Sequence, residues 1–254
     1  MKITYIAHSG FCVELEKHVL LFDYFTGELP SWDKEKTILV FASHKHQDHF
    51  SLRILELRKE YPHIHYFFGN DIKLKPDYLL RKKADPEALS DVTVMKAHEQ
   101  TGYGGESQAV TVRTLKSTDE GVAFLVEAEG KTFYHAGDLN WWHWEGEPAS
   151  WNRNMETGFR REIDSIAGER FDAAFVPLDP RLEAAYGLGM DYFLQKTSAT
   201  HVFPMHMWRN TAIFPNIRKH RPDGSMRRKS LTSADAEKNL CFKKAGGTCI
   251  WNRL

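Results

Sequence analysis

The chain has 254 residues, enough to bury a sizeable hydrophobic core in one domain or in one sandwich of two similar halves. It carries 34 Lys and Arg against 34 Asp and Glu, so no global field favours nucleic acid or membranes. Its 3 cysteines form no Cys-x-x-Cys pair, and the odd number argues against a disulfide framework. No export signal opens it, and no apolar run approaches the ~18 residues of a membrane span. We therefore expect a cytoplasmic protein.

The first quarter of the chain is predicted to form strands. Residues 2–7 alternate apolar and polar side chains, and residues 11–15 and 19–23 predict two more strands joined by a tight turn. Asp23 ends the third strand. A carboxylate after a buried strand often orients a metal-binding imidazole through the ring nitrogen that does not bind the metal, and the alternative is an Asp that stabilises a turn.

The densest cluster of ligand-type side chains follows the next strand. Residues 37–42 are apolar and β-branched, which indicates a buried strand, and residues 50–61 place apolar side chains on one helical face. The intervening turn holds three imidazoles and a carboxylate: His44, His46, Asp48 and His49. Two residues apart in extended backbone, the first two imidazoles point to the same side. These groups are ligands for zinc, iron or manganese, and four of them can serve one or two ions.

The remaining elements are predicted from hydrophobic periodicity and from turn signals. We expect further strands at residues 66–68, 92–95, 109–115, 122–128, 131–134, 171–178 and 201–203. We expect helices at residues 70–84, 153–168, 182–197 and 233–244, the third of them interrupted near Gly187 and Gly189. The glycine-rich stretch at residues 102–105 is predicted to be a loop.

Three further polar residues stand at or after strand ends. Asp138 follows residues 134–137, so a buried strand runs into a Gly-Asp pair at the edge of a sheet, where sites in layered α/β proteins lie; the alternative is a turn. His98 and His206 also follow predicted strands, and from the residues alone nothing beyond that position marks them as ligands.

Four tryptophans lie within residues 139–151: Trp141, Trp142, Trp144 and Trp151. Their rings would either wall a pocket and stack on a flat substrate group, or anchor the loop to the core. A basic run at residues 218–229 would capture an anion or form a solvated loop.

The spacing His44-x-His46-x-Asp48-His49 resembles the signature of the metallo-β-lactamase superfamily of metal-dependent hydrolases. The resemblance extends to residues 3–11, 20–23, 134–138 and 204–206, and in detail is similar to the branch with ascorbate-6-phosphate lactonase-like proteins. It implies an α/β (α+β) fold, a four-layer αββα sandwich, formed by residues 1–254 as a single domain. The site would lie at one edge of the two sheets.

The resemblance also implies roles for particular residues. One ion would be held by His44, His46 and Asp138, and the other by Asp48, His49, Asp138 and His206. Asp48 and Asp138 would be the catalytic carboxylates, with a metal-activated water attacking carbon or phosphorus. Asp23, His8, Trp141, Trp142 and Trp144 would support the ligands or touch the substrate, although a loop histidine held by the backbone is the simpler interpretation of His8.

The sequence departs from the family pattern at one ligand. Ser117 takes the approximate place of the family's middle histidine, and a neutral hydroxyl is a poor metal ligand. Asp119 or His98 would have to replace it. Otherwise the protein would hold one tight ion and one loose ion or none.

These features favour a hydrolase of a small polar or phosphorylated metabolite, of the lactone or phosphodiester type. One alternative is a metal-binding or sensing protein with a degenerate site. Another is an RNA-processing nuclease of the same fold, against which the zero net charge counts. We expect one or two divalent ions per chain, zinc first, with manganese and iron also suited. The expected partner is a small-molecule substrate, without membrane; homo-oligomers are compatible with the sequence.

Overall fold

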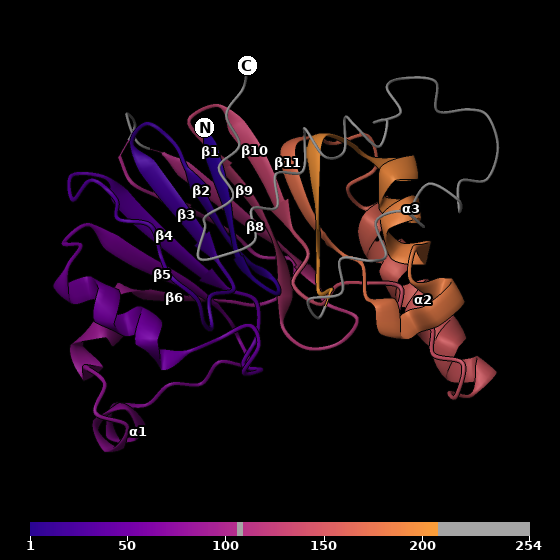
Figure 1. The fold of residues 1–254 in the computed structure, drawn as a ribbon, viewed down its shortest axis with the longest axis horizontal. Coiled ribbons are helices and arrows are strands. Elements are labelled where there is room, and N and C mark those ends of the chain that lie inside the picture. The colour runs from indigo at the N-terminus through magenta and orange to yellow at the C-terminus, as the bar shows by residue number, and fades with distance from the viewer. Residues whose placement is uncertain (106–108, 208–254) are drawn as a thin grey trace.

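Two six-stranded sheets form the centre of the computed structural model, which describes residues 1–105 and 109–207 (Figure 1). The first sheet consists, in spatial order, of β1 (Lys2–Ala7), β2 (Gly10–Glu14), β3 (His18–Phe22), β4 (Thr37–Ala42), β5 (Ile64–Gly69) and β6 (Val92–Met95). The second has the order β12 (Ser198–Met205), β11 (Arg170–Pro177), β10 (Lys131–His135), β9 (Val122–Ala128), β8 (Val110–Lys116) and β7 (Gln100–Tyr103).

Both sheets combine antiparallel and parallel pairs. In the first sheet β1, β2 and β3 are antiparallel, and β3 to β6 run parallel. In the second sheet β7 to β10 are antiparallel, and β10, β11 and β12 run parallel. Parallel strands present their carboxyl ends at one edge, so each sheet brings several strand-end loops together there.

Helices lie outside the two sheets, which gives four layers (Figure 1). The 3₁₀ helices η1 (Leu52–Lys59) and η2 (Pro86–Asp91) and the short α1 (Pro76–Arg81) pack against the first sheet. The helices α2 (Ala149–Asp164) and α3 (Leu188–Lys196) pack against the second. A 3₁₀ helix, η4 (Pro180–Ala185), precedes α3.

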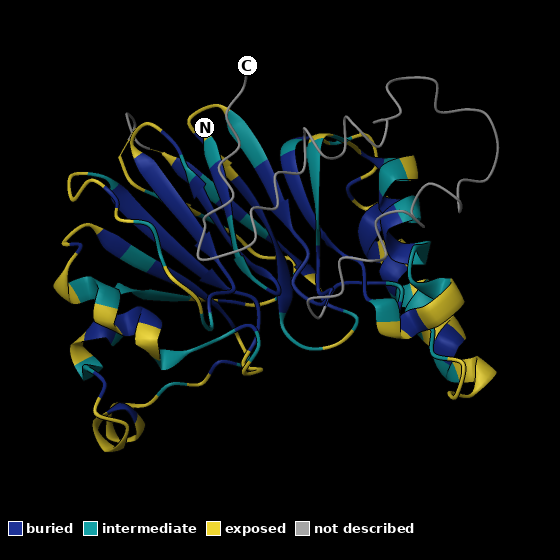
Figure 2. Cartoon of the chain, viewed as in Figure 1, coloured by how far each residue is buried: buried dark blue, intermediate teal, exposed yellow. Residues whose placement is uncertain are grey.

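The strand β4 shows why the sheets are enclosed. All six of its residues are buried, and they alternate between two clusters: Leu39 and Phe41 join the core between the sheets, whereas Ile38 and Val40 face the outer helices. A strand that is apolar on both faces is stable only when both faces are covered. Figure 2 shows the strands mostly buried and the exposed residues on outer helices and loops.

The predicted fold class is confirmed, with local differences in the elements. Residues 50–61 form the shorter 3₁₀ helix η1. The predicted interruption of the helix 182–197 is present, since η4 ends at Ala185 and α3 begins at Leu188, with a further break at Glu183, which has φ 50°. Residues 102 and 103 of the predicted loop 102–105 belong to β7, since backbone pairing with β8 outweighs the low strand propensity of glycine.

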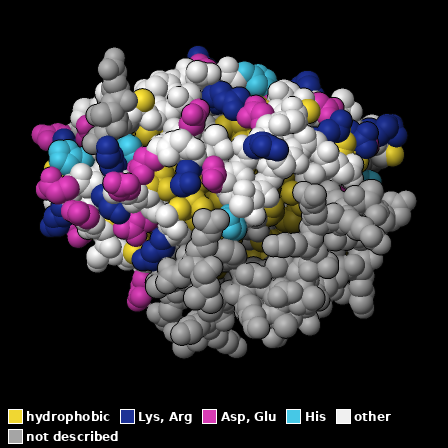
Figure 3. Space-filling view, turned by 90° about the horizontal axis from the view of Figure 1, so that it is seen from above, with side chains coloured by type: hydrophobic (Ala, Val, Ile, Leu, Met, Phe, Trp, Pro, Cys, Tyr) yellow, Lys and Arg dark blue, Asp and Glu magenta, His cyan; other side chains and the backbone are white. Residues whose placement is uncertain are grey.

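Several predictions fall on residues that the structure does not describe: the basic run 218–229 and the helix 233–244. In residues 1–105 and 109–207 no helix is long and apolar enough to cross a membrane. Charged side chains of both signs occur across the described part of the face seen in Figure 3, in keeping with the zero net charge.

Glycines allow the loop after β4 to pack closely on the second sheet. The backbone N–H of Val122 donates to the carbonyl oxygen of Ser43, at 3.1 Å. A Cβ atom added to Gly121 would lie 2.0 Å from that oxygen, and the φ of Gly121 is +70°, which L side chains rarely adopt. This contact fixes the start of the His-rich turn against the start of β9.

We expect Gly121→Ala to lower the free energy of unfolding by at least about 2 kcal/mol, because it adds both a clash and backbone strain. Urea unfolding followed by circular dichroism measures this. Gly146→Ala is the control, since its Cβ would meet no atom within 4 Å, and should cost less than about 0.5 kcal/mol. Equal stability of the two variants would mean that the close approach at Ser43 is not rigid.

Candidate metal centre

Strand-end loops from both sheets meet at one place. Asp23 follows β3, and the turn with His44, His46, Asp48 and His49 follows β4. From the second sheet, Asp138 comes shortly after β10, Asp179 after β11 and His206 directly after β12. The turn between β1 and β2 adds His8. The parallel arrangement therefore assembles residues that lie far apart in the sequence.

Three imidazoles converge on the carboxylate of Asp138. The Nε2 atoms of His44, His49 and His206 lie 3.5, 3.2 and 3.5 Å from its oxygens. All four residues are almost completely buried. His44 and His49 are 0% exposed, His206 is 3% exposed and Asp138 is 4% exposed. Asp138 thus lies between the two halves of the site.

The opposite nitrogen of each of these imidazoles is held by a buried polar group. His49 Nδ1 donates to Asp23 at 2.7 Å, and His206 Nδ1 donates to Asp179 at 2.8 Å. The Ser43 hydroxyl donates to Asp23 at 2.7 Å and accepts from His44 Nδ1 at 2.9 Å. These hydrogen bonds place a proton on each Nδ1, so that Nε2 is the ring nitrogen that faces the centre.

This arrangement fits a bound cation. Three imidazole Nε2 atoms around a buried carboxylate need positive charge among them, which either a ring proton or a cation bound by the Nε2 lone pairs supplies. Among the described residues, the buried atoms His49 Nε2 and Asp138 Oδ1 make no hydrogen bond, although they lie 3.2 Å apart. Buried polar atoms without hydrogen bonds are rare, and imidazole with carboxylate is a common ligand set for divalent transition metals.

The ligand-type atoms form two groups, each with all atoms within 4.8 Å of one another: His44, His46 and Asp138, and His8, Asp48, His49 and His206. In the first group His44 Nε2 lies 3.1 Å from His46 Nδ1. The second group contains Asp48, His49 and His206 of the ligands implied by the resemblance, with His8 in addition, whereas Asp138 falls in the first group. The two groups adjoin through Asp138, which faces His49 and His206 as well as His44.

The charges of the site are strongly coupled. Burial lowers the pKa of His44 to about 4, and His49 adds to this effect. Burial also acts to lower the pKa of His49, but Asp138 and then Asp23 outweigh it and raise that pKa to about 9. Burial acts to raise the pKa of Asp23, but neighbouring histidines, His135 and His49 first, lower it to about 2. The centre as a whole favours positive charge.

Three residues at the site have left-handed backbone. The φ angles of His8, Asp23 and His206 are 52°, 42° and 65°, a conformation that costs energy for residues other than glycine. Such strain is characteristic of functional sites because it aims a side chain in a direction that a regular strand cannot.

The structure distinguishes between the three residues that could replace the missing middle histidine ligand. His98 Nε2 lies 2.7 Å from Glu162, and its side chain is 59% exposed, which corrects the expectation that it reaches the site. Ser117 is buried and its hydroxyl accepts from the backbone of Asp119. Asp119 itself lines the pocket beside His46, so its carboxylate is the nearest replacement.

A pocket of about 320 Å³ opens over the centre. Besides His46, Asp48, Asp138 and His206 it is lined by Thr118, Asp119, Trp142, Trp144, Trp151, Met155 and Arg181. Trp142 stacks parallel to Trp144 at 6.1 Å, and the Arg181 guanidinium lies over Trp144 at 5.5 Å. The loop tryptophans therefore form a wall of the pocket.

Trp141 does not belong to this wall. It packs against Phe159 of α2 and Tyr192 of α3, and the guanidinium of Arg160 lies 4.7 Å from its ring. The expectation that Trp141 touches the substrate is thus corrected: successive side chains of the loop point to different sides, and this one anchors the loop.

The sequence did not predict that Asp179 supports a histidine of the site. For His8 it favoured a loop histidine held by the backbone, whereas the structure places His8 with Asp48, His49 and His206. Asp179 ends β11 as Asp23 ends β3, and this repeated position was the available signal. Its partner His206 lies 27 residues further on, so only the parallel pairing of β11 and β12 reveals the contact. His8 lies in a turn between two strands, and nothing in the sequence of that turn indicates a metal ligand.

Comparison with known proteins agrees with this fold. Residues 2–143 match the family model described as the β-lactamase superfamily domain. The chain is 30% identical over 152 residues to a protein from Opitutus terrae named a UPF0173 metal-dependent hydrolase. That match covers 54% of this chain and 63% of the relative. A relative of the same name from Alkaliphilus metalliredigens is 24% identical over 189 residues, 70% of this chain and 73% of the relative.

Solved structures show the same fold. A metal-dependent hydrolase, so described, from Parabacteroides distasonis aligns with a TM-score of 0.54 at 13% identity, over 82% of this chain and 83% of that chain. Igni18, described as a metallo hydrolase from Ignicoccus hospitalis, aligns with a TM-score of 0.50 at 18% identity. The alignment covers 100% of this chain and 99% of that chain. A layered sandwich with a His/Asp centre at the strand ends is the metallo-β-lactamase fold. The chain belongs to the β-lactamase superfamily.

We expect Asp23→Asn to lower the free energy of unfolding of chelator-treated protein by about 2–3 kcal/mol at pH 7. The folded-state pKa of about 2 lies below the usual 3.8, so the stabilisation by Asp23 is complete above pH 4 and is lost as the pH falls towards 2. Urea unfolding of both proteins between pH 7 and 2 measures it. The stability gap should close in acid; a gap independent of pH would assign the effect to packing.

Proposed function

We propose that this protein is a metal-dependent hydrolase of a small polar or phosphorylated metabolite. The observation that carries the proposal is the convergence of three buried Nε2 atoms on the carboxylate of Asp138, each ring being held at Nδ1 by a buried acceptor. Such outer hydrogen bonds fix the tautomer and raise the basicity of metal-binding imidazoles.

The residues fit two cations. His44, His46 and Asp138 would hold one, with Asp119 as an added carboxylate, and Asp48, His49, Asp138 and His206 would hold the other. When bound, such ions lower the pKa of water, polarise the scissile group and stabilise the negative charge that develops on it. Zinc, manganese and iron all accept this donor set.

The chain's own residues would bind and orient the substrate. Trp142 and Trp144 offer an apolar wall beside the centre, and Arg181 places a cation at the same wall. Arg181 Nε donates to both carboxylate oxygens of Asp179, at 3.0 Å to Oδ1 and 2.9 Å to Oδ2. These hydrogen bonds fix the direction of the guanidinium. A flat group would stack on the tryptophans, and an anionic group, such as a phosphate or carboxylate, would lie near Arg181.

Asp48 would move a proton at the reacting centre. Its side chain is only 26% exposed and lines the pocket. The contact with His8, whose Nε2 lies 3.4 Å away, and the charge of His49 keep its pKa well below the usual range despite burial. It therefore stays ionised at neutral pH and can accept a proton from water.

The names of the relatives from Opitutus terrae and Alkaliphilus metalliredigens support hydrolysis and metal dependence. The choice of a lactone or a phosphodiester, and the likeness to the ascorbate-6-phosphate lactonase branch, rest on the sequence resemblance. The size of the pocket, about 320 Å³, suits a small metabolite.

The first experiment measures metal per chain by plasma mass spectrometry on protein purified without chelator, followed by hydrolysis assays on lactone and phosphodiester substrates. We expect one to two equivalents, activity that chelator abolishes, and, in His46→Ala, a lower metal content with loss of activity. His63→Ala is the matched control, because His63 is also exposed but lies in neither ligand group. Metal without any hydrolysis would favour the sensing protein instead.

With a substrate in hand, we expect Trp144→Ala to raise KM roughly 3- to 10-fold with little change in kcat, because stacking contributes to binding rather than to the reacting centre. Trp144→Phe should recover most of the affinity. Steady-state kinetics measures both constants. A lower kcat with unchanged KM would place Trp144 in a different role.

A further inference from the structure

We propose that His8 is a metal ligand that joins Asp48, His49 and His206 at the ion they share with Asp138. The inference rests on the proposed function only in supposing that an ion binds at the centre. It adds a ligand from the first turn of the chain, outside the His44–His49 signature and the two later strand ends.

The distances of up to 3.5 Å between histidine nitrogens and carboxylate oxygens fall into two classes. Hydrogen-bonded pairs lie at 2.7–2.8 Å: His49–Asp23, His206–Asp179, His18–Glu129 and His98–Glu162. Pairs that face each other across the metal centre lie at 3.2–3.5 Å: His44–Asp138, His49–Asp138 and His206–Asp138. His8 Nε2 lies 3.4 Å from Asp48 Oδ2, within the second class.

A separation of this size is what ligation requires. Tetrahedral ligand atoms about 2.1 Å from a zinc ion lie about 3.4 Å from one another. A hydrogen bond between imidazole and carboxylate would be shorter, at about 2.7–2.9 Å. His8 and Asp48 are therefore spaced as two ligands of one ion rather than as a donor and its acceptor.

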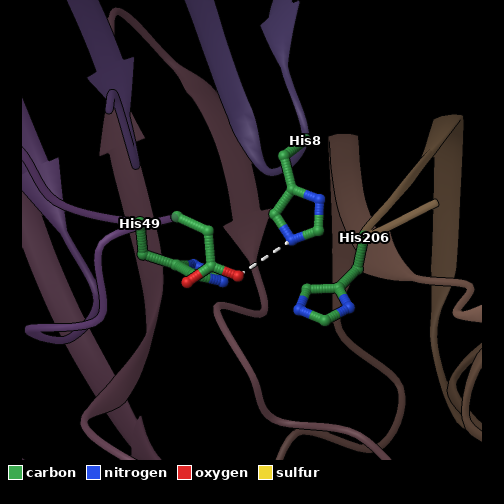
Figure 4. A group of neighbouring side chains, drawn as sticks. His8, His49 and His206 are labelled. Atoms are coloured by element: carbon green, nitrogen blue, oxygen red, sulfur yellow. Dashed lines mark ion pairs between the residues drawn. The ribbon is translucent and has the colours of Figure 1, made fainter. Parts of the chain in front are cut away.

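The orientation of the rings agrees with this assignment. Figure 4 shows His8, His49 and His206 pointing toward one another from three separate loops, with the dashed line marking the contact of His8 with the carboxylate. The ring of His8 lies 4.2 Å from that of His206 and 5.7 Å from that of His49. Its side chain is only 7% exposed.

The backbone holds this position rigidly. The N–H of His8 donates to the Tyr5 hydroxyl at 2.9 Å, and the N–H of His206 donates to the carbonyl oxygen of His8 at 3.4 Å. Both histidines have positive φ. The first turn and the end of β12 are thus tied together at the two residues whose rings face each other, which preorganises both as ligands.

A consequence is that the two ions would bind unequally. The group with His8 has four ligand-type residues, three of them buried, and the carboxylate of Asp138 adjoins it. The other group has three, Asp138 included, with His46 exposed. We expect the first ion to enter the site with His8 and the second to bind more weakly at His44, His46 and Asp138.

The direct test is NMR spectroscopy of the full chain. Its histidines are labelled with an NMR-active nitrogen isotope, and the protein is loaded with one equivalent of an NMR-active cadmium isotope. A nitrogen bound to cadmium shows a one-bond coupling to it. We expect this coupling at Nε2 of His8, His49 and His206, each assigned by the resonance that its substitution removes. Coupling at His49 and His206 with none at His8 would overturn the inference. No coupling at any histidine would instead refute the proposed metal centre.

The second test compares affinities for zinc in competition with a chromophoric chelator. His8→Gln keeps a hydrogen-bonding amide near Asp48 but removes the strong nitrogen ligand. We expect it to weaken the tighter binding constant about 100-fold or more, whereas His46→Ala should change that constant only a few-fold. Wild-type affinity in His8→Gln would show that His8 serves Asp48 alone and would overturn the assignment.

Discussion

The structure depends on one electrostatic constraint: a buried carboxylate, Asp138, faces the Nε2 atoms of three buried imidazoles. Without positive charge between them this arrangement is unfavourable, so the centre is built to hold cations. The outer hydrogen bonds reinforce it. Asp23 and Asp179 each take one imidazole proton, and the Ser43 hydroxyl relays the same effect to a third ring, so the direction of every lone pair is set from outside.

The scaffold tolerates these buried polar groups because it encloses the centre between two rigid sheets. The strands β3 and β4 on one side and β10 to β12 on the other are parallel, and their carboxyl ends meet. Close contact at Gly121 joins the His-rich turn to the second sheet. The strain at His8, Asp23 and His206 is tolerated because buried hydrogen bonds on both sides fix these residues.

Around the centre, chemistry and recognition are divided between different loops. Ligand-type residues come from strand ends, whereas the wall of the pocket comes from the segment between β10 and α2 and from Arg181. Trp142 connects the two, since its Nε1 donates to the backbone oxygen of Asp138 and its ring contacts His206 at 5.5 Å. Substrate selection can therefore vary with one loop while the centre stays unchanged.

The sequence by itself predicted most of the strands along the chain and the local ligand turn, because hydrophobic periodicity and the spacing from His44 to His49 are local properties. The layered fold was implied by the resemblance to a known superfamily, and the order of strands within each sheet came only from the structure. The sequence did not reveal the partnership of Asp179 with His206, the place of His8 beside Asp48, or which candidate near position 117 lines the pocket. Those depend on distances between loops separated by up to 198 residues, since His8 and His206 meet only when β1 and β12 close the same side of the sandwich. Periodicity carries no information about such contacts; tertiary packing alone decides them.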